Sequence, residues 1–191
     1  EMVWTRIFSA EFFYTFAFLI LSLAILGLGL GALALRLVPF LNRHGTIGWS
    51  LTLAGLMALI GPPLVVASGL DFTVMFSSPA MIAKMVLVVA ILSSSFFFGG
   101  IALALLFKQN VKEMPSLYMA DLLGAGGGVL IVIALMNGIG TPSASFLVAL
   151  PILLAAIMAA PKIVKAVPAA LIVLMFVMLP SSRSLLEAER T

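Results

Sequence analysis

Asp121 is the side chain of this sequence best placed to do chemistry in an apolar environment. It is the one charged residue in an apolar run from Ser116 to Met136. A carboxylate near the centre of a membrane helix costs about 2.5–3.5 kcal/mol on insertion scales, so it faces protein or water and has a partner. Two interpretations stay open. Asp121 is a proton or cation site, or it is an interfacial carboxylate that holds helices together near Pro115.

Helical spacing places Asp121 on one face with Tyr118, Gly124 and Gly128, three or four residues apart. Gly124 and Gly128 form a G-x-x-x-G pair, which lets a second helix approach closely. We therefore expect Asp121 to point into a tight contact between helices and to meet a donor there. The candidate donors are Arg6, Tyr118, Thr5 and a free backbone amide near Pro115.

A second polar group opens the chain, where Glu1 and Thr5 share a helical face and Arg6 lies beside them. Arg6 is a candidate ionic partner for Asp121 or Glu1. The predicted intramembrane polar cluster consists of Glu1, Thr5, Arg6, Tyr118 and Asp121. The alternative is that the charged side chains of residues 1–11 extend to the lipid headgroups, as long charged side chains do at membrane surfaces.

Enzyme chemistry has little support in the residue types present, and whether the chain is an enzyme stays open. The sequence has no cysteine and one histidine, His44, so it lacks thiolate metal ligands and the imidazoles that a histidine-ligated metal needs. Gly27–Gly31 and Gly126–Gly128 resemble nucleotide-binding glycine runs, but no strand pattern precedes them, so helix packing is the better interpretation. No catalytic residue, cofactor or metal is predicted.

The elements that position these residues follow from composition. Of the 191 residues, 63% are hydrophobic and 9% are charged, and the mean hydropathy is +1.29. Soluble domains carry about 25% charged residues, and a small domain leaves much of its surface exposed. The sequence therefore predicts an all-α, polytopic integral membrane protein whose main partner is the lipid bilayer. A net charge of +3 is too small to indicate nucleic-acid binding.

Six apolar runs have the length of membrane spans. They are Phe12–Leu35, Ile47–Gly69, Ala80–Phe107, Ser116–Met136, Ser143–Ala160 and Ile163–Leu179. The last two are short, and one of them is a candidate for an incomplete crossing. Pro62 and Pro63 fall inside the second run and are expected to kink or break it, because proline removes a backbone donor.

The two ends of the chain are expected to continue elements of a longer protein. Residues 1–11 are amphipathic and are expected to be the end of an earlier helix that begins before Glu1. Residues 1–180 form the predicted multi-pass membrane domain. The polar tail 181–191 is expected to be the start of a further segment.

The distribution of Lys and Arg predicts the orientation of the spans. Three alternate loops carry two basic residues each: 36–46 with Arg36 and Arg43, 108–115 with Lys108 and Lys112, and 161–165 with Lys162 and Lys165. The loops near 70–79 and 137–142 carry none. Basic loops stay in the cytoplasm, so the three loops are predicted to be cytoplasmic in a cell inner (plasma) membrane. Strict alternation then places the tail 181–191 outside.

Small residues mark the predicted helix contacts. Gly27 and Gly31 form one pair at helical spacing, and Gly124 and Gly128 form the other. Lipid gives helices no hydrophobic reason to associate, so small residues that allow close approach are expected at the contact points. Trp4 and Trp49 suit the interfacial aromatic belt.

Two stretches carry a family resemblance. The first is Glu1–Ser9 (EMVWTRIFS) followed by Leu26–Ala32 (LGLGLGA), and the second is Leu117–Gly128 (LYMADLLGAGGG). Together they resemble the membrane domain of bacterial spermidine-synthase-like proteins, in which several helices are fused to an aminopropyltransferase-type domain. The resemblance implies a half-helix before Glu1 and a soluble domain after Thr191. These residues include no such domain, so aminopropyl transfer is not expected of this chain. A cytosolic enzyme domain also conflicts with a tail outside the membrane.

The residues favour one function and leave a second open. The favoured function is a membrane anchor or assembly module, either for a fused soluble domain or as an accessory subunit beside other membrane subunits. The alternative is a transporter or channel for a small cation such as a polyamine. It needs convergent acidic residues at membrane depth, and Asp121 is the clear candidate, with Glu1 and Glu11 as further candidates. A membrane enzyme would need a catalytic constellation that is not found.

Overall fold

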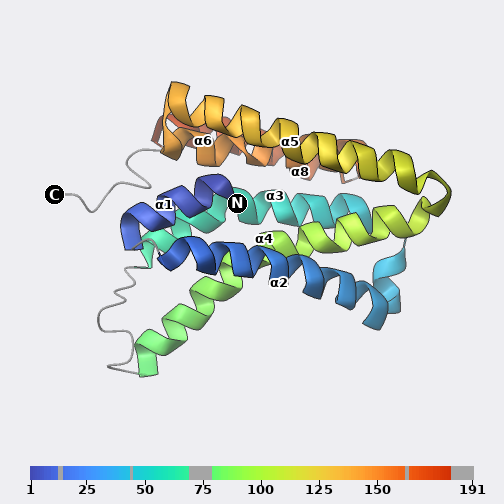
Figure 1. The fold of residues 1–191 in the computed structure, drawn as a ribbon, viewed down its shortest axis with the longest axis horizontal. Helices are drawn as coiled ribbons and strands as arrows, with labels where there is room; N and C mark the ends of the chain where they lie inside the picture. Colours follow the sequence, from blue (N-terminus) through green and yellow to red (C-terminus); the bar gives the residue numbers. More distant parts are fainter. Residues whose placement is uncertain (13–14, 44, 69–78, 162–163, 182–191) are drawn as a thin grey trace.

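The chain folds into a bundle of helices, shown in Figure 1. The computed structural model describes residues 1–12, 15–43, 45–68, 79–161 and 164–181, and these contain helices and no strand. The α-helices are α1 (Met2–Phe12), α2 (Thr15–Leu37), α3 (Thr46–Ala67), α4 (Pro79–Gln109), α5 (Met114–Ile139), α6 (Thr141–Leu147), α7 (Ala149–Ala159) and α8 (Ala166–Met178). Short 3-10 turns are η1 (Pro39–Asn42), η3 (Val111–Glu113) and η4 (Leu179–Ser181). The predicted all-α membrane bundle is confirmed.

Within the described residues, five helical segments are long and apolar enough to cross a membrane. They are Phe18–Leu37, Thr46–Ala67, Pro79–Gln109, Val111–Ile139 and Thr141–Ala159. The sixth predicted span is shorter than expected. Its helix α8 has 13 residues, or about 20 Å of length, against about 30 Å of hydrocarbon in a bilayer. Even with η4 added, the segment ends at Ser181 and stays below the length of a full crossing.

Prolines act differently from expectation in the second and fifth predicted spans. Helix α3 runs without a break through Pro62 and Pro63, so of the kink or break expected there, the break is wrong. Pro62 is buried, and neighbouring helices make such a position tolerable in a membrane. The interruption instead falls at Val148, between α6 and α7. Pro151 cannot donate to the carbonyl of Leu147, four residues earlier, so the regular ladder of hydrogen bonds is lost there.

The body of the bundle consists of α2, α3, α4 and α7. Helix α4 packs against both α2 and α3 (Figure 1), and α3 packs against α7. Gly27 and Gly31 of α2 lie directly on α4. A Cβ added at Gly27 would be 2.7 Å from the Phe96 Cβ, and one at Gly31 would be 2.7 Å from the Ile101 nitrogen. Glycine is therefore what lets these two backbones come together.

The basic loops meet at one end of the bundle, on the right in Figure 1. Lys108, at the end of α4, donates a hydrogen bond of 2.6 Å to the Asn42 side-chain oxygen in η1. The loop after α7 joins them, because a Cβ added at Gly45 would lie 3.6 Å from Pro161. Three loops that are far apart in sequence therefore share one end, as an orientation set by basic loops requires.

Helix α1 is an 11-residue element that packs on the opposite half of the bundle. Its Val3, Trp4 and Ile7 side chains are buried, while Met2 and Arg6 are exposed. The buried positions are three or four residues apart and form one apolar face, which packs against α2, α5 and α6. This position of α1 brings Trp4 to the centre of the molecule.

Candidate functional site

Helix α5 lies apart from the body of the bundle. None of its described residues is buried, although half of the most hydrophobic part of α3 is. Its main neighbour is α6, the next helix in sequence, with a smaller contact to α1 (Figure 1). An apolar helix that packs so little leaves space on one face and open surface on the other.

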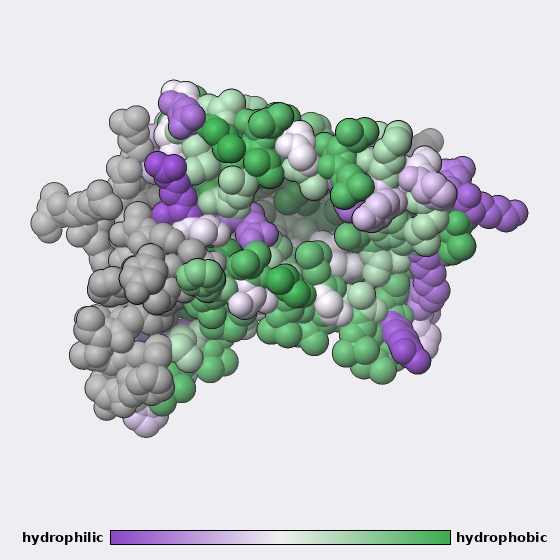
Figure 2. Space-filling model, viewed as in Figure 1, coloured by the Kyte–Doolittle hydropathy of each residue, from purple (hydrophilic) through white to green (hydrophobic). Residues whose placement is uncertain are grey.

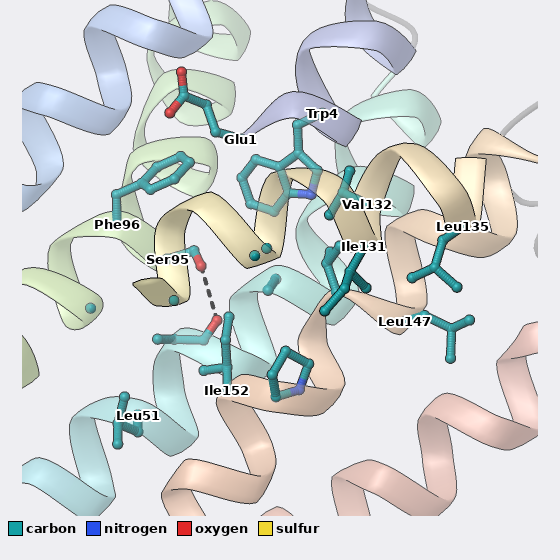
Figure 3. A pocket seen from close by; sticks show the side chains of 18 of the residues that line it. Glu1, Trp4, Leu51, Ser95, Phe96, Ile131, Val132, Leu135, Leu147 and Ile152 are labelled. Carbon is teal, nitrogen blue, oxygen red and sulfur yellow. Dashed lines mark hydrogen bonds between the residues drawn. The ribbon is translucent and has the colours of Figure 1, made fainter. Parts of the chain in front are cut away.

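The space on the inner face of α5 is a cavity of about 710 Å³. In the space-filling view, this side of the molecule is hollowed between α5 and α2 (Figure 2). The wall on α5 is made by Leu123, Gly124, Gly127, Gly128, Ile131, Val132 and Leu135. The facing wall comes from α1, α2, α3, α4, α6 and α7, including Trp4, Leu51, Ser95, Phe96, Leu147 and Ile152 (Figure 3).

The cavity wall is almost entirely apolar. Among the lining residues, the polar side chains are those of Glu1, Ser95 and the indole of Trp4. The Ser95 hydroxyl donates a hydrogen bond of 3.0 Å to the Ala54 carbonyl, so this hydroxyl proton is not available to a ligand (Figure 3). The Glu1 carboxylate is turned away from Ser95 in Figure 3. The cavity therefore offers a ligand mainly hydrocarbon contact.

Trp4 is the exception in this wall. Its side chain is 3% exposed and meets Phe96 edge to face, with ring centroids 5.5 Å apart. Its ring lies beside Ile131 and Val132 in Figure 3. Among the described residues, the indole N–H has no hydrogen-bond acceptor. The expectation that Trp4 belongs to the interfacial belt is wrong, because it lies in the core. Trp49, by contrast, is exposed near the basic end.

Asp121 does not lie in a tight contact between helices, so that prediction is wrong. Its side chain is exposed, and it makes no hydrogen bond or ion pair with any described residue. The reason is the position of α5, which is too far from the body to bring a donor to it. Tyr118 is 57% exposed on the same helix and offers it no hydrogen bond either.

The predicted polar cluster is not assembled in the described part of the chain. Glu1 and Thr5 lie close together beside a smaller cavity of about 310 Å³, with Phe18 and Leu21. Arg6 is exposed and forms no ion pair there with Glu1 or Asp121. Helical spacing predicted which residues share a face of one helix. It did not predict which faces of different helices pack against each other.

The two glycine pairs have different surroundings. Gly27 and Gly31 lie against α4, as described above. A Cβ added at Gly124 or Gly128 would meet no described atom within 4 Å, so their expected role as helix contacts within this chain is wrong. These two glycines line the cavity instead.

Comparison with known proteins brings no identity to this site. No family, curated protein or solved structure matches the chain. The described residues also contain no group of three or more His, Cys, Asp or Glu side chains that could hold a metal ion. The site offers a ligand an apolar wall and, within the part of the chain that the structure describes, the unpaired indole N–H of Trp4.

The cavity is the feature that sequence reasoning missed. Its lining comes from six helices besides α5, and each contributes residues that look like ordinary membrane-helix positions. One signal was present. Val3, Trp4 and Ile7 have the spacing of a buried helical face, which places Trp4 inside rather than at a membrane surface.

Proposed function

We propose that this chain is a membrane-embedded assembly module, and that the outer face of α5 receives a helix of another membrane protein. The supporting observation is the exposure of α5 on the side opposite the cavity. Leu122, Gly126, Val129 and Ile133 recur at helical spacing on that side, and all four are exposed. They form the outer stripe of α5.

The composition of the outer stripe suits a helix contact in lipid. Lipid tails are as apolar as leucine, so membrane helices associate through close packing and interhelical hydrogen bonds. Gly126 has no side chain and leaves a depression in the helix surface between Leu122 and Leu130. Nothing lies within 4 Å of a Cβ added there. A second helix can therefore approach α5 closely at Gly126.

Asp121 lies beside the outer stripe rather than within it, because it shares a helical face with Gly124 and Gly128, which line the cavity. It lies about 10 Å along the axis from the start of α5 at Met114, and it is exposed without a partner among the described residues. A carboxylate at the centre of a membrane helix costs about 2.5–3.5 kcal/mol, and Asp121, about 8 Å from the middle of α5, carries part of that cost. A helix docked on the outer stripe reaches Asp121 only at the edge of the contact, where a long donor side chain of the partner would offset this cost.

Cation transport has less support in this geometry. A cation pathway needs oxygen ligands that converge at membrane depth. The lining of the large cavity includes one carboxylate, Glu1, and the rest of the wall is apolar apart from Ser95 and Trp4. Asp121 is not among its lining residues.

The setting of the module is part of the proposal. The end formed by the basic loops faces the cytoplasm, and the membrane is the cell inner (plasma) membrane. The resemblance to spermidine-synthase-like membrane domains gives one candidate for what is anchored, an aminopropyltransferase-type domain. A separate membrane subunit is the other candidate, and the exposure of α5 favours it.

Cross-linking along α5 tests the assembly proposal, since the sequence has no native cysteine. Single cysteines at Gly126 or Val129 would be labelled with a benzophenone maleimide in native membranes and irradiated. We expect protein adducts from these outer positions. Cysteines at Gly124 or Ile131, on the cavity face, serve as matched controls and should give few. Equal protein cross-linking from both faces, or none from either, would contradict the proposal.

A further inference from the structure

The size of the cavity beside α5 decides what class of molecule it can hold. Its volume of about 710 Å³ lies inside the range of about 300–1,000 Å³ found for small-molecule sites. A helix about 10 Å wide that crosses about 30 Å of hydrocarbon occupies roughly 2,400 Å³. The cavity is therefore too small for a partner helix and the right size for a small ligand.

The depth of the cavity restricts the ligand further. Phe96, in the cavity wall, packs on Gly27, which lies near the middle of the span Phe18–Leu37. Gly27 is about 15 Å from Leu37 along the helix axis, or half the thickness of the hydrocarbon region. Trp4 contacts Phe96 at this depth. A molecule in the cavity therefore lies at the depth of the hydrocarbon core, among mainly apolar side chains, with Glu1 as the one charged residue of the lining.

The unsatisfied indole of Trp4 gives the ligand one polar requirement. Trp4 is 3% exposed, lines the cavity and has no acceptor among the described residues. Among the described residues no buried side-chain nitrogen lacks a partner, so the unpaired Nε1 of Trp4 can be reached from the cavity, and a ligand that supplies an acceptor can pair with it. The hydroxyl of Ser95 already donates to Ala54, which leaves the indole as the free donor of the inner wall.

We infer that the cavity binds an uncharged, carbonyl-bearing lipid, whose carbonyl oxygen accepts a hydrogen bond from Trp4 Nε1. The apolar wall holds the hydrocarbon part of the molecule. The ester carbonyls of a bilayer phospholipid lie near the edge of the hydrocarbon region, about 15 Å from its centre, and so do not reach Trp4. A lipid without a charged headgroup lacks the group whose desolvation holds a phospholipid at the bilayer surface, so its carbonyl can enter the core and reach Trp4. This site is separate from the outer stripe of α5.

Two neutral sources share this chemistry, a ring carbonyl on an isoprenoid-type quinone and an acyl ester of a diacylglycerol. Tryptophan fluorescence separates them, because the chain has two tryptophans. In the Trp49→Phe variant the emission comes from Trp4 alone. The purified protein in nanodiscs would be titrated with decylubiquinone, with dioleoylglycerol, and with hexadecane, which has no carbonyl.

We expect a saturable change in Trp4 emission with at least one carbonyl-bearing probe, at a concentration at least tenfold below any effect of hexadecane. The probe that acts identifies the source. In the Trp4→Phe variant, which keeps the exposed Trp49, the emission should change linearly with probe concentration and should not saturate. Equal responses to hexadecane and both carbonyl probes, or no saturable response to any, would overturn the inference.

Variants that fill the cavity provide a second, independent test of the proposed binding site. In the Trp49→Phe background, Gly128→Leu adds a side chain that points into the cavity and meets no atom within 4 Å at its Cβ, so the helix can accept it. Gly99→Leu fills the cavity from α4 in the same way and covers the case in which one variant fails to fold. We expect each to weaken probe binding at least tenfold. Gly29→Leu, on α2 and outside the cavity lining, also has nothing within 4 Å of an added Cβ, so it is the matched control and should leave probe binding unchanged. Undiminished binding in a folded, filled variant would refute the site.

Discussion

Replacement of Gly31 by leucine is expected to abolish the folded bundle. Gly31 of α2 lies against the backbone of α4, where an added Cβ would contact the Phe97 carbonyl and lie 2.9 Å from the Gly100 carbon. Backbone atoms cannot move aside as a flexible side chain can, so α2 and α4 must separate. Gly100 reinforces the constraint, because a Cβ there would lie 2.5 Å from the Leu28 carbonyl oxygen. Overpacking of a core by a few carbons already costs about 1–3 kcal/mol.

Gly29→Leu is the matched control for this prediction. Gly29 lies two residues away on the same helix, and a Cβ there would meet nothing within 4 Å. Fluorescence-detected gel filtration in mild detergent, followed by a thermal ramp, measures both variants. We expect loss of the monodisperse peak for Gly31→Leu and a peak like the wild type for Gly29→Leu. A normal peak and melting temperature for Gly31→Leu would show that α2 and α4 do not pack as described.

Replacement of Asp121 by leucine is expected to leave insertion into the membrane intact and to weaken association with the proposed partner. It removes a carboxylate whose cost is at most the value of about 2.5–3.5 kcal/mol at the centre of a membrane helix, so the amount of inserted chain should stay the same or rise. It also removes the acceptor proposed for a partner's donor. Interhelical hydrogen bonds contribute about 0.6–2 kcal/mol, which corresponds to about 3- to 30-fold weaker association.

Asp121→Asn serves as the comparison, because the amide oxygen can still accept a hydrogen bond. The yield of protein adduct from a benzophenone at Val129 measures association in both variants. We expect Asp121→Asn to keep most of the yield and Asp121→Leu to lose most of it at unchanged expression. Equal yields from all three proteins would mean that Asp121 has no part in the contact.

The membrane-spanning helices could be predicted because their physical cause lies within each segment. Apolar runs of the right length must form helices in lipid, and α2 to α5 lie within a few residues of the predicted spans. The fifth span differs because Pro151 divides it into α6 and α7. The contact of Gly27 and Gly31 with α4 was also accessible, since small residues at helical spacing mark close approach.

The site could not be predicted because it depends on how far helices stand from one another. The spacing of Asp121, Gly124 and Gly128 shows that they lie on nearby parts of one helix surface. It does not show that α5 stands off from the body and leaves a cavity there. The same holds for Arg6, whose distance from Asp121 is set by the packing of α1 rather than by local sequence.

The central claim, that α5 is covered by another protein in the membrane, is tested most directly by the mass of the unit extracted from native membranes. Native mass spectrometry of the tagged protein, released from detergent-free nanodiscs, would report the chain together with whatever protein remains bound. We predict a discrete species that contains the chain and a second protein subunit, and that is depleted in the Gly126→Leu variant. A species that contains one copy of the chain and lipids alone would contradict the account.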